Sequence, residues 1–159
     1  MNADAIARGL NGLNPETEAI AAGRVMLAHM DALAANREDF ALETTLAART
    51  YARFLSELKV AGYEVYLFYY WLSSAELAIS RVAERVRAGG HHIPDATVRQ
   101  RYSKSIRNFF ELYRPLTDEW RVYDNTLKQA RLVAFGLGDH EHVLDGDTWT
   151  DIERSADHG

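Results

Sequence analysis

One run of the chain, YEVYLFYYWL at positions 63–72, constrains the fold more than any other stretch. Apolar residues fill it without alternating with polar ones, so a strand formed there has two apolar faces. Such a strand is typical of a parallel sheet that helices cover on both sides. The run therefore predicts a buried parallel strand in an α/β fold.

Two helices and a further strand are expected before this run. Asn14 and Pro15 are typical of a helix start, and apolar residues then recur at helical spacing up to residue 36. The stretch DFALETT, residues 39–45, predicts a short buried strand that ends in polar side chains. A second apolar stripe over 51–58 predicts another helix, which Gly62 ends.

The segments after the run continue the alternation. Ser73 to Glu76 predicts a capped helix start, and Gly89 and Gly90 end that helix. Helical spacing resumes between Val98 and Phe109. Three stretches beyond Pro115, WRVYDNT, ARLVAFG and EHVLDG, are typical of short strands or loops. The order predicts one domain over residues 1–159, built on a doubly wound parallel sheet.

Composition narrows the classes of protein. With 159 residues and 47% apolar content, the chain is long enough for one domain with a core. It has no cysteine, no leader and no run of membrane-spanning length, which predicts a cytoplasmic protein without membrane contact. Its net charge of -5 disfavours a nucleic-acid partner.

The charges are unevenly distributed. Residues 81–114 carry eight basic and three acidic side chains, which marks a basic helical region. The chain beyond residue 139 is acidic, and residues from about 150 to 159 are expected to form a flexible tail.

Polar side chains follow the expected strands, where ligands bind in α/β folds. These groups are Asp4, the run Glu43–Thr45 and the run Asp124–Thr126. A carboxylate can accept the proton of a bound hydroxyl, while Glu43 and Thr45 can orient a substrate. Arginines of the basic region can bind phosphate, so the set is typical of phosphoryl transfer.

Each group also has a structural alternative. Asp4 can cap a helix, Glu43 can pair with an arginine, and Asp124 with Asn125 can form a turn. Arg81 and Arg85 can belong to a solvated helix face. The histidines at 91–92 and in the run 139–142 lack a defined ligand set, so no metal site is expected.

Four stretches, taken in order, resemble the zeta-toxin-like family of P-loop kinases, whose best-known members phosphorylate UDP-N-acetylglucosamine. They are Asn2 to Arg8, FALETTLA at 40–47, the run from Arg81 to Tyr113, and WRVYDNT at 120–126. Together they cover nearly the whole chain. The resemblance implies a P-loop kinase-like sheet with a helical lid.

The resemblance also implies roles for individual residues. Asp4 matches the general base, Glu43 and Thr45 match substrate-binding positions, and Arg81 resembles the arginine that stabilises the transferred phosphate. Four residues fall in the lid-like region: Arg85, His91, Arg99 and Arg101. Asp124 and Asn125 are expected on the nucleotide side. ATP and Mg²⁺ are the implied cofactors, and an antitoxin-like protein is a possible partner.

The chain departs from the family in one respect. The pattern G-x-x-x-x-G-K-[ST], whose backbone, lysine and hydroxyl hold the phosphates and Mg²⁺, occurs nowhere in the sequence. The family's first strand lies inside the sheet, so the chain is expected to be truncated at its N-terminus and to expose apolar faces of residues 65–72. Kinase activity would then require a restored loop.

Three functions remain open at this point. One is an ATP-dependent kinase acting on a small hydroxyl-bearing substrate such as a nucleotide sugar. Another is a catalytically inert remnant or a protein-interaction module. The third, a nucleic-acid binder that uses residues 81–114, is disfavoured by the acidic total.

Overall fold

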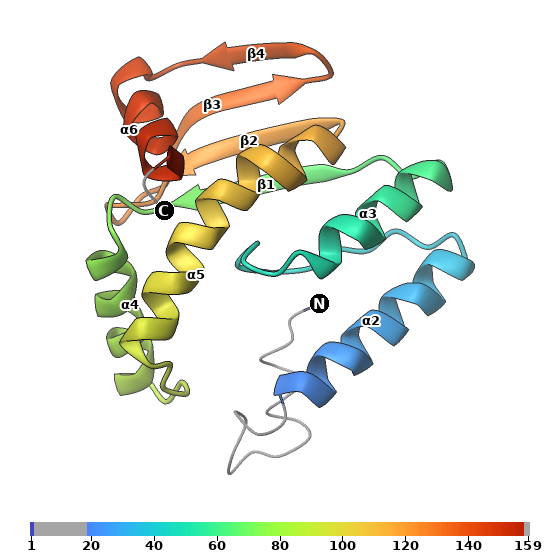
Figure 1. The fold of residues 1–159 in the computed structure, drawn as a ribbon, viewed down its shortest axis with the longest axis horizontal. Coiled ribbons are helices and arrows are strands. Elements are labelled where there is room, and N and C mark those ends of the chain that lie inside the picture. Colours follow the sequence, from blue (N-terminus) through green and yellow to red (C-terminus); the bar gives the residue numbers. More distant parts are fainter. Residues whose placement is uncertain (2–18, 158–159) are drawn as a thin grey trace. The chain divides into compact units, whose positions relative to one another are not determined.

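The computed structural model describes residue 1 and residues 19–157 in two compact units, Met1–Thr44 and Thr45–Gly159, and each unit is described by itself. Figure 1 shows the elements of both. No helix among the described residues is both long and apolar enough to cross a membrane.

The first unit contains one described helix, α2 (Ala19–Ala35). Met26 and Met30, two of the apolar residues at helical spacing, are fully buried. The expected helix start at Asn14 and Pro15 lies outside the described residues.

The strand expected over residues 39–45 does not form. Only Glu43 is bridged: its N–H donates to the Met1 carbonyl at 2.7 Å, and the Met1 ammonium group donates to the Ala41 carbonyl. A strand needs a continuous ladder of backbone hydrogen bonds, and a single bridge does not provide one. The apolar content of this stretch was therefore misleading.

The second unit contains a four-stranded sheet in the order β1-β2-β3-β4. Its strands are β1 (Tyr66–Trp71), β2 (Glu119–Asp124), β3 (Arg131–Leu137) and β4 (His140–Val143). β1 and β2 are parallel, whereas β2, β3 and β4 are antiparallel. The predicted α/β class is confirmed and β1 with β2 forms a parallel pair, but the sheet is mixed rather than parallel throughout, because the connections after β2 and β3 are too short for a parallel crossover.

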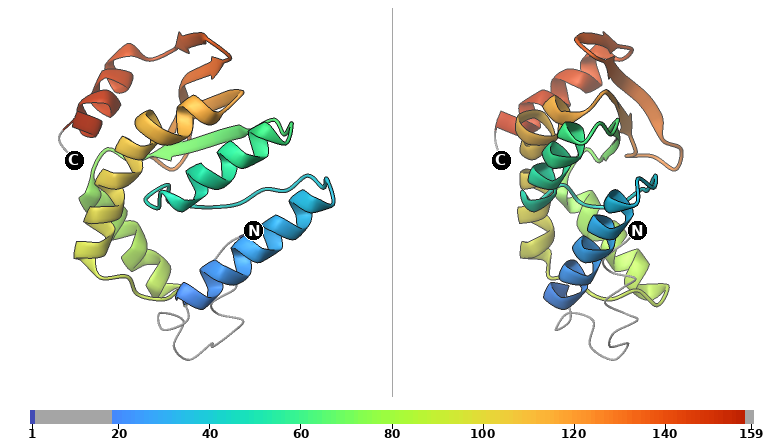
Figure 2. Two further views of the ribbon diagram at one scale, coloured as in Figure 1. Left: turned by 45° about the vertical axis from the view of Figure 1, so that its right-hand side comes forward. Right: turned by 90° about the vertical axis from the view of Figure 1, so that its right-hand side faces the viewer.

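Helices α4 (Ala75–Arg87) and α5 (Asp95–Asn108) form the crossover between β1 and β2. A π-helical turn (Phe109–Tyr113) and a 3₁₀ turn (Arg114–Leu116) follow α5, and α3 (Thr50–Val60) precedes β1. Residues 146–157 form α6 (Gly146–Asp157), so the expected flexible tail is largely helical. α5 and α6 lie on the same side of the sheet (Figure 2).

Aromatic rings fill the space between the sheet and these helices. Trp120 of β2 stacks on Trp149 of α6 with centroids 5.7 Å apart, and Phe109 meets Trp120 edge-on at 5.9 Å. Tyr69 of β1 stacks on Phe109 at 4.9 Å. The buried α6 tryptophan explains why this part of the chain is ordered as a helix.

The opposite face of β1 is uncovered. Tyr66, Phe68 and Tyr70 are 56%, 51% and 54% exposed, whereas Tyr69 and Trp71 are buried. The prediction of helices on both sides of the strand was wrong in the second unit. The expectation that residues 65–72 expose an apolar face is confirmed.

Gly136 provides a test of the aromatic core. A Cβ at this position would lie 2.2 Å from Nε1 of Trp120, so Gly136→Ala must displace the indole. We expect the free energy of unfolding to fall by about 1–3 kcal/mol in urea denaturation. Gly146→Ala, where an added Cβ meets nothing within 4 Å, is the control, and an equal loss there would contradict this explanation.

Asp118 links stability to pH. Its carboxylate accepts from Lys59 Nζ at 2.5 Å and from the Val65 N–H at 2.7 Å, and these contacts lower the Asp118 pKa. Because the Asp118 pKa is lower in the folded state than the unfolded-state value of about 3.9, the ionised carboxylate stabilises the fold above that pH. This stabilisation is lost as the pH falls from about 3.9 through the folded-state pKa. We therefore expect Asp118→Asn to be less stable than the wild type at pH 7, with the difference narrowing below about pH 4. A difference that stays constant in acid denaturation curves would refute the linkage.

Candidate functional site

The carboxyl ends of β1 and β2 meet at one edge of the sheet because the two strands are parallel. Two backbone N–H groups join the loops that follow: Asn125 donates to the Trp71 carbonyl at 2.8 Å, and Ser73 donates to Thr126 Oγ1 at 3.1 Å. In α/β folds this edge is where ligands bind.

Helix α4 starts at the same edge. Ser74 is its N-cap, and the Ser74 hydroxyl accepts from the Leu77 N–H at 3.1 Å. This confirms the capped helix start predicted over Ser73 to Glu76. The first turn of α4 therefore directs its partial positive charge toward the loops that follow β1 and β2.

Arg81 extends from α4 to the loop after β2. Its Nη2 donates to the carbonyls of Asn125 at 2.6 Å and of Thr126 and Leu127 at 3.2 Å each. Arg81 is therefore partly buried and holds this loop, rather than lying on a solvated face. Its Nε and Nη1 make no hydrogen bond within the part of the chain that the structure describes.

Asp124 ends β2 and is occupied by structural contacts. Its Oδ1 accepts from the Thr126 N–H at 2.9 Å, which is the turn given above as the structural alternative. Its Oδ2 lies 3.7 Å from Nη2 of Arg131, and Arg131 Nη1 also pairs with Asp145 at 2.6 Å. The Asp124 carboxylate thus lies beside Arg131, which also pairs with Asp145 directly before α6.

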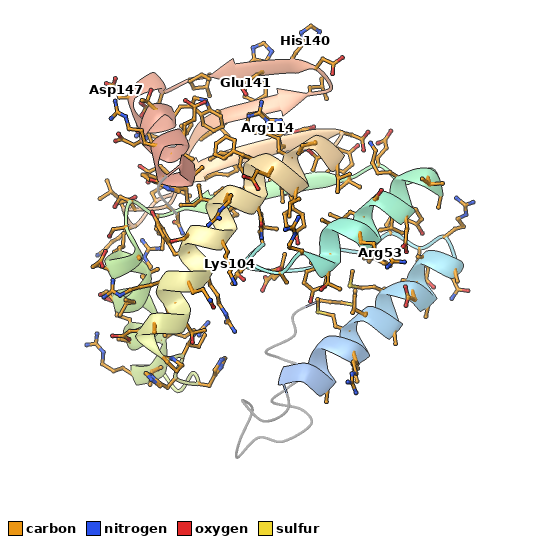
Figure 3. All side chains as sticks on the ribbon, viewed as in Figure 1. Arg53, Lys104, Arg114, His140, Glu141 and Asp147 are labelled. Carbon is orange, nitrogen blue, oxygen red and sulfur yellow. The ribbon has the colours of Figure 1, made fainter. Side chains whose placement is uncertain are left out.

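The basic region divides into bound and exposed residues. Arg99 pairs with Glu76 between α5 and α4, and this contact, after the backbone N–H of Glu76 itself, lowers the Glu76 pKa. Arg114 pairs with Glu141 at 2.5 Å and lies 4.6 Å from the Trp120 ring centroid (Figure 3). The remaining exposed cations without a partner among the described residues are Arg85, Arg87, Arg101 and Lys104.

The lid-like residues are not joined to Arg81. No hydrogen bond or ion pair within residues 19–157 links it to Arg85, Arg99 or Arg101. His91 lies partly buried in the loop between α4 and α5.

A pocket of about 450 Å³ opens beside this edge. Trp71 and Ser73 line it from β1 and the loop that follows, and α6 contributes Asp151, Arg154 and Ser155. The hollow is shallow and mostly open to solvent. The sequence analysis missed the α6 residues, because their stretch was assigned to a tail.

The substrate-side residues remain predictions. Asp4 lies outside the described residues, while Glu43 and Thr45 are exposed and belong to different units. Their role beside Arg81 is an expectation of the resemblance.

The described residues do not form a complete binding site for Mg²⁺ and ATP. Arg81 and the start of α4 offer donors to an anion, but no group of three or more His, Asp or Glu residues among those described is arranged to hold a metal ion. The only carboxylate at the end of β2 is already bound to Arg131 and the turn.

Comparison with known proteins gives three findings. The family model described as zeta toxin matches residues 14–132. A protein of Haemophilus influenzae, described only as an uncharacterized protein, is 29% identical over 102 residues, which cover 64% of this chain and 73% of the relative. No solved structure matches the chain significantly.

Arg81→Ala tests whether the guanidinium holds the loop after β2. Losing charged hydrogen bonds to three carbonyls should lower the free energy of unfolding by about 1–3 kcal/mol. We expect the amides of Asn125 to Leu127 to exchange at least about tenfold faster in hydrogen exchange, since about 1.4 kcal/mol corresponds to a factor of ten. Arg85→Ala, one turn further along α4, should leave them unchanged, and equal effects would contradict the tether.

Proposed function

This chain belongs to the zeta toxin family, and from that membership we propose that it carries the substrate side and the lid side of an ATP-dependent phosphotransferase. The substrate we propose is a small hydroxyl-bearing molecule such as a nucleotide sugar. Family membership supports a kinase-like phosphotransferase, and the residue roles below are our own assignment.

Arg81 carries the proposal. Three carbonyl contacts hold its Nη2 at the carboxyl edge of the parallel strand pair, while Nε and Nη1 have no partner in the described part of the chain. A guanidinium fixed in advance loses little side-chain entropy when it binds a phosphate. Arg81 would therefore stabilise the charge that develops on the transferred phosphoryl group.

Asp4 would act as the general base and take the proton from the substrate hydroxyl. Glu43 and Thr45 would orient that substrate by hydrogen bonds. Both residues are exposed.

The lid would be formed by α4, α5 and the loop between them. Arg85 and Arg101 are exposed and without a partner in the described residues, so they can turn toward a phosphate, and His91 lies in the connecting loop. Arg99 would have to leave Glu76 first. Asp124 and Asn125, at the end of β2, would lie on the nucleotide side.

Phosphoryl transfer in this proposal depends on a phosphate-binding loop, because G-x-x-x-x-G-K-[ST] does not occur in the sequence. ATP and Mg²⁺ would be bound mainly by that loop. In the described sheet β1 pairs with β2 alone, which is consistent with a further strand beside it.

A catalytically inert interaction module is the second candidate. The half-exposed aromatic rings of β1 favour it, because exposed apolar patches often mark protein contacts. An antitoxin-like protein is one partner of this kind.

Binding and turnover separate the two candidates. We expect the 159-residue chain to show no measurable affinity for Mg-ATP in calorimetric titration. The same chain joined to a strand, loop and helix with G-x-x-x-x-G-K-[ST] should bind Mg-ATP and phosphorylate a nucleotide sugar. Tight binding by the 159-residue chain would overturn the need for the loop.

In the joined protein, Arg81→Ala and Asp4→Asn should each lower kcat by about 10²–10³, and Asp4→Asn should do so with little change in ATP affinity. Arg87→Ala is the matched control, since it is an exposed arginine of α4 without an assigned role. A joined protein that binds Mg-ATP but transfers no phosphate to nucleotide sugars or to water would favour the inert module.

A further inference from the structure

The backbone at Leu46 is the feature on which a further inference rests. Leu46 has a φ of 56°, in the left-handed region, where the backbone crowds the Cβ of any residue but glycine. Its side chain is only 4% exposed and belongs to the aromatic core of the second unit. A leucine keeps such a backbone conformation only where the surrounding structure holds it.

This strained residue directly follows Thr45. Thr45 is exposed whereas Leu46 is buried, and both belong to the second unit. The conformation of Leu46 therefore determines where the Thr45 side chain reaches the surface.

Asn108 holds the backbone of Leu46. It is the last residue of α5 and is 8% exposed, and its Nδ2 donates to the Leu46 carbonyl at 2.7 Å. The two residues are 62 positions apart in the chain, so the contact comes from the fold and not from local sequence. A buried carbonyl without a donor costs free energy, so losing this amide would favour a different conformation at Leu46.

Tyr113 makes a second contact to the same loop. Its ring is 1% exposed, and its hydroxyl donates to the Ala48 carbonyl. An α-helix turns about 100° per residue, so residues five apart, such as Asn108 and Tyr113, point to different sides of it. The wider π-helical turn, in which the Arg114 N–H donates to the Phe109 carbonyl, brings both side chains to the loop.

We propose that Asn108 is a positioning residue for the substrate: through the Leu46 carbonyl it fixes the backbone from which Thr45 contacts the phosphoryl acceptor. This inference rests on the proposed function, in which Thr45 orients a hydroxyl-bearing substrate and α5 is part of the lid. Asn108 is buried, so it acts through the backbone and not by contact with the substrate.

The same contact joins two parts of the proposed site. α5 carries Arg99 and Arg101 of the lid near its start and Asn108 at its end. A loop that adopts its binding conformation only part of the time binds its ligand more weakly by that fraction. Losing the Asn108 contact therefore weakens binding of the substrate and leaves binding of the nucleotide unchanged.

Hydrogen exchange of the 159-residue chain tests the contact itself. Asn108→Leu keeps the approximate size of the side chain and removes the donor, so the amides of residues 46–48 should exchange at least about tenfold faster. Tyr113→Phe removes only a hydroxyl and should change the same amides in the same direction. Unchanged exchange in both variants would overturn the proposal.

Ser105→Ala is the matched control. Ser105 is also in α5 and also 8% exposed, but its hydroxyl shares a hydrogen bond of 3.1 Å with the Tyr69 hydroxyl in the core. Its loss should leave the amides of residues 46–48 unchanged. Equal acceleration in Ser105→Ala and Asn108→Leu would show a general loss of stability and would contradict a specific contact.

Steady-state kinetics of the joined protein test the effect on the substrate. Asn108→Leu should raise the KM for the nucleotide sugar at least about tenfold at saturating Mg-ATP, and should leave the KM for Mg-ATP within about twofold. Ser105→Ala should change neither value.

Failure of this inference is distinguishable from failure of the proposed function. A joined protein that transfers no phosphate overturns the proposed function, whatever the exchange rates show. An active joined protein in which Asn108→Leu changes the two KM values equally, or changes neither, overturns only the positioning role of Asn108.

Discussion

Trp120 is the side chain on which the second unit depends. Trp149 stacks on its ring, Phe109 meets it edge-on, and the Arg114 guanidinium lies over it. Gly136 of β3 leaves room for the indole where any other residue would collide with it. One residue of β2 thereby joins the sheet to the π-helical turn, the 3₁₀ turn and α6.

Local signals in the sequence predicted the elements, but not all of their partners. Ser74, Gly62 and the stripe from Val98 to Phe109 act locally, so the cap, the left-handed turn and the buried helix face could be inferred. The prediction of a strand over residues 39–45 was wrong, because an apolar run does not specify which strand will pair with it. The antiparallel pairing of β3 with β4 could have been predicted from the sequence. Gly138, at φ 55°, and Asp139 form a two-residue connection typical of a hairpin.

Helix α6 could likewise have been predicted from the sequence. Asp145 accepts from the Thr148 N–H at 3.1 Å and from its hydroxyl at 3.0 Å, so it holds the start of the helix. Trp149 and Ile152 follow at helical spacing and are buried. The acidic composition obscured this pattern, because charge was taken as a sign of a solvated tail.

The candidate site shows a different limit of sequence reasoning. Arg81 could be assigned either to a phosphate or to a solvated helix face, yet its observed acceptors are backbone carbonyls more than forty residues away. Carbonyl acceptors leave no trace in side-chain identity, so only the fold reveals such a contact. The substrate-side roles of Asp4, Glu43 and Thr45 still depend on the resemblance to the family. The position of the Arg81 guanidinium, in contrast, is explained by its hydrogen bonds to three carbonyls.

The two faces of β1 connect the fold with the proposed function. One face is filled by the aromatic core, while the other has the same apolar character and no helix of the second unit over it. Exposing an apolar strand face to water costs free energy, and an unpaired strand edge is a place where a further strand can add. A segment that brought a phosphate-binding loop and paired with β1 would reduce that cost, so the apolar character of both faces is consistent with the proposed phosphotransferase sheet.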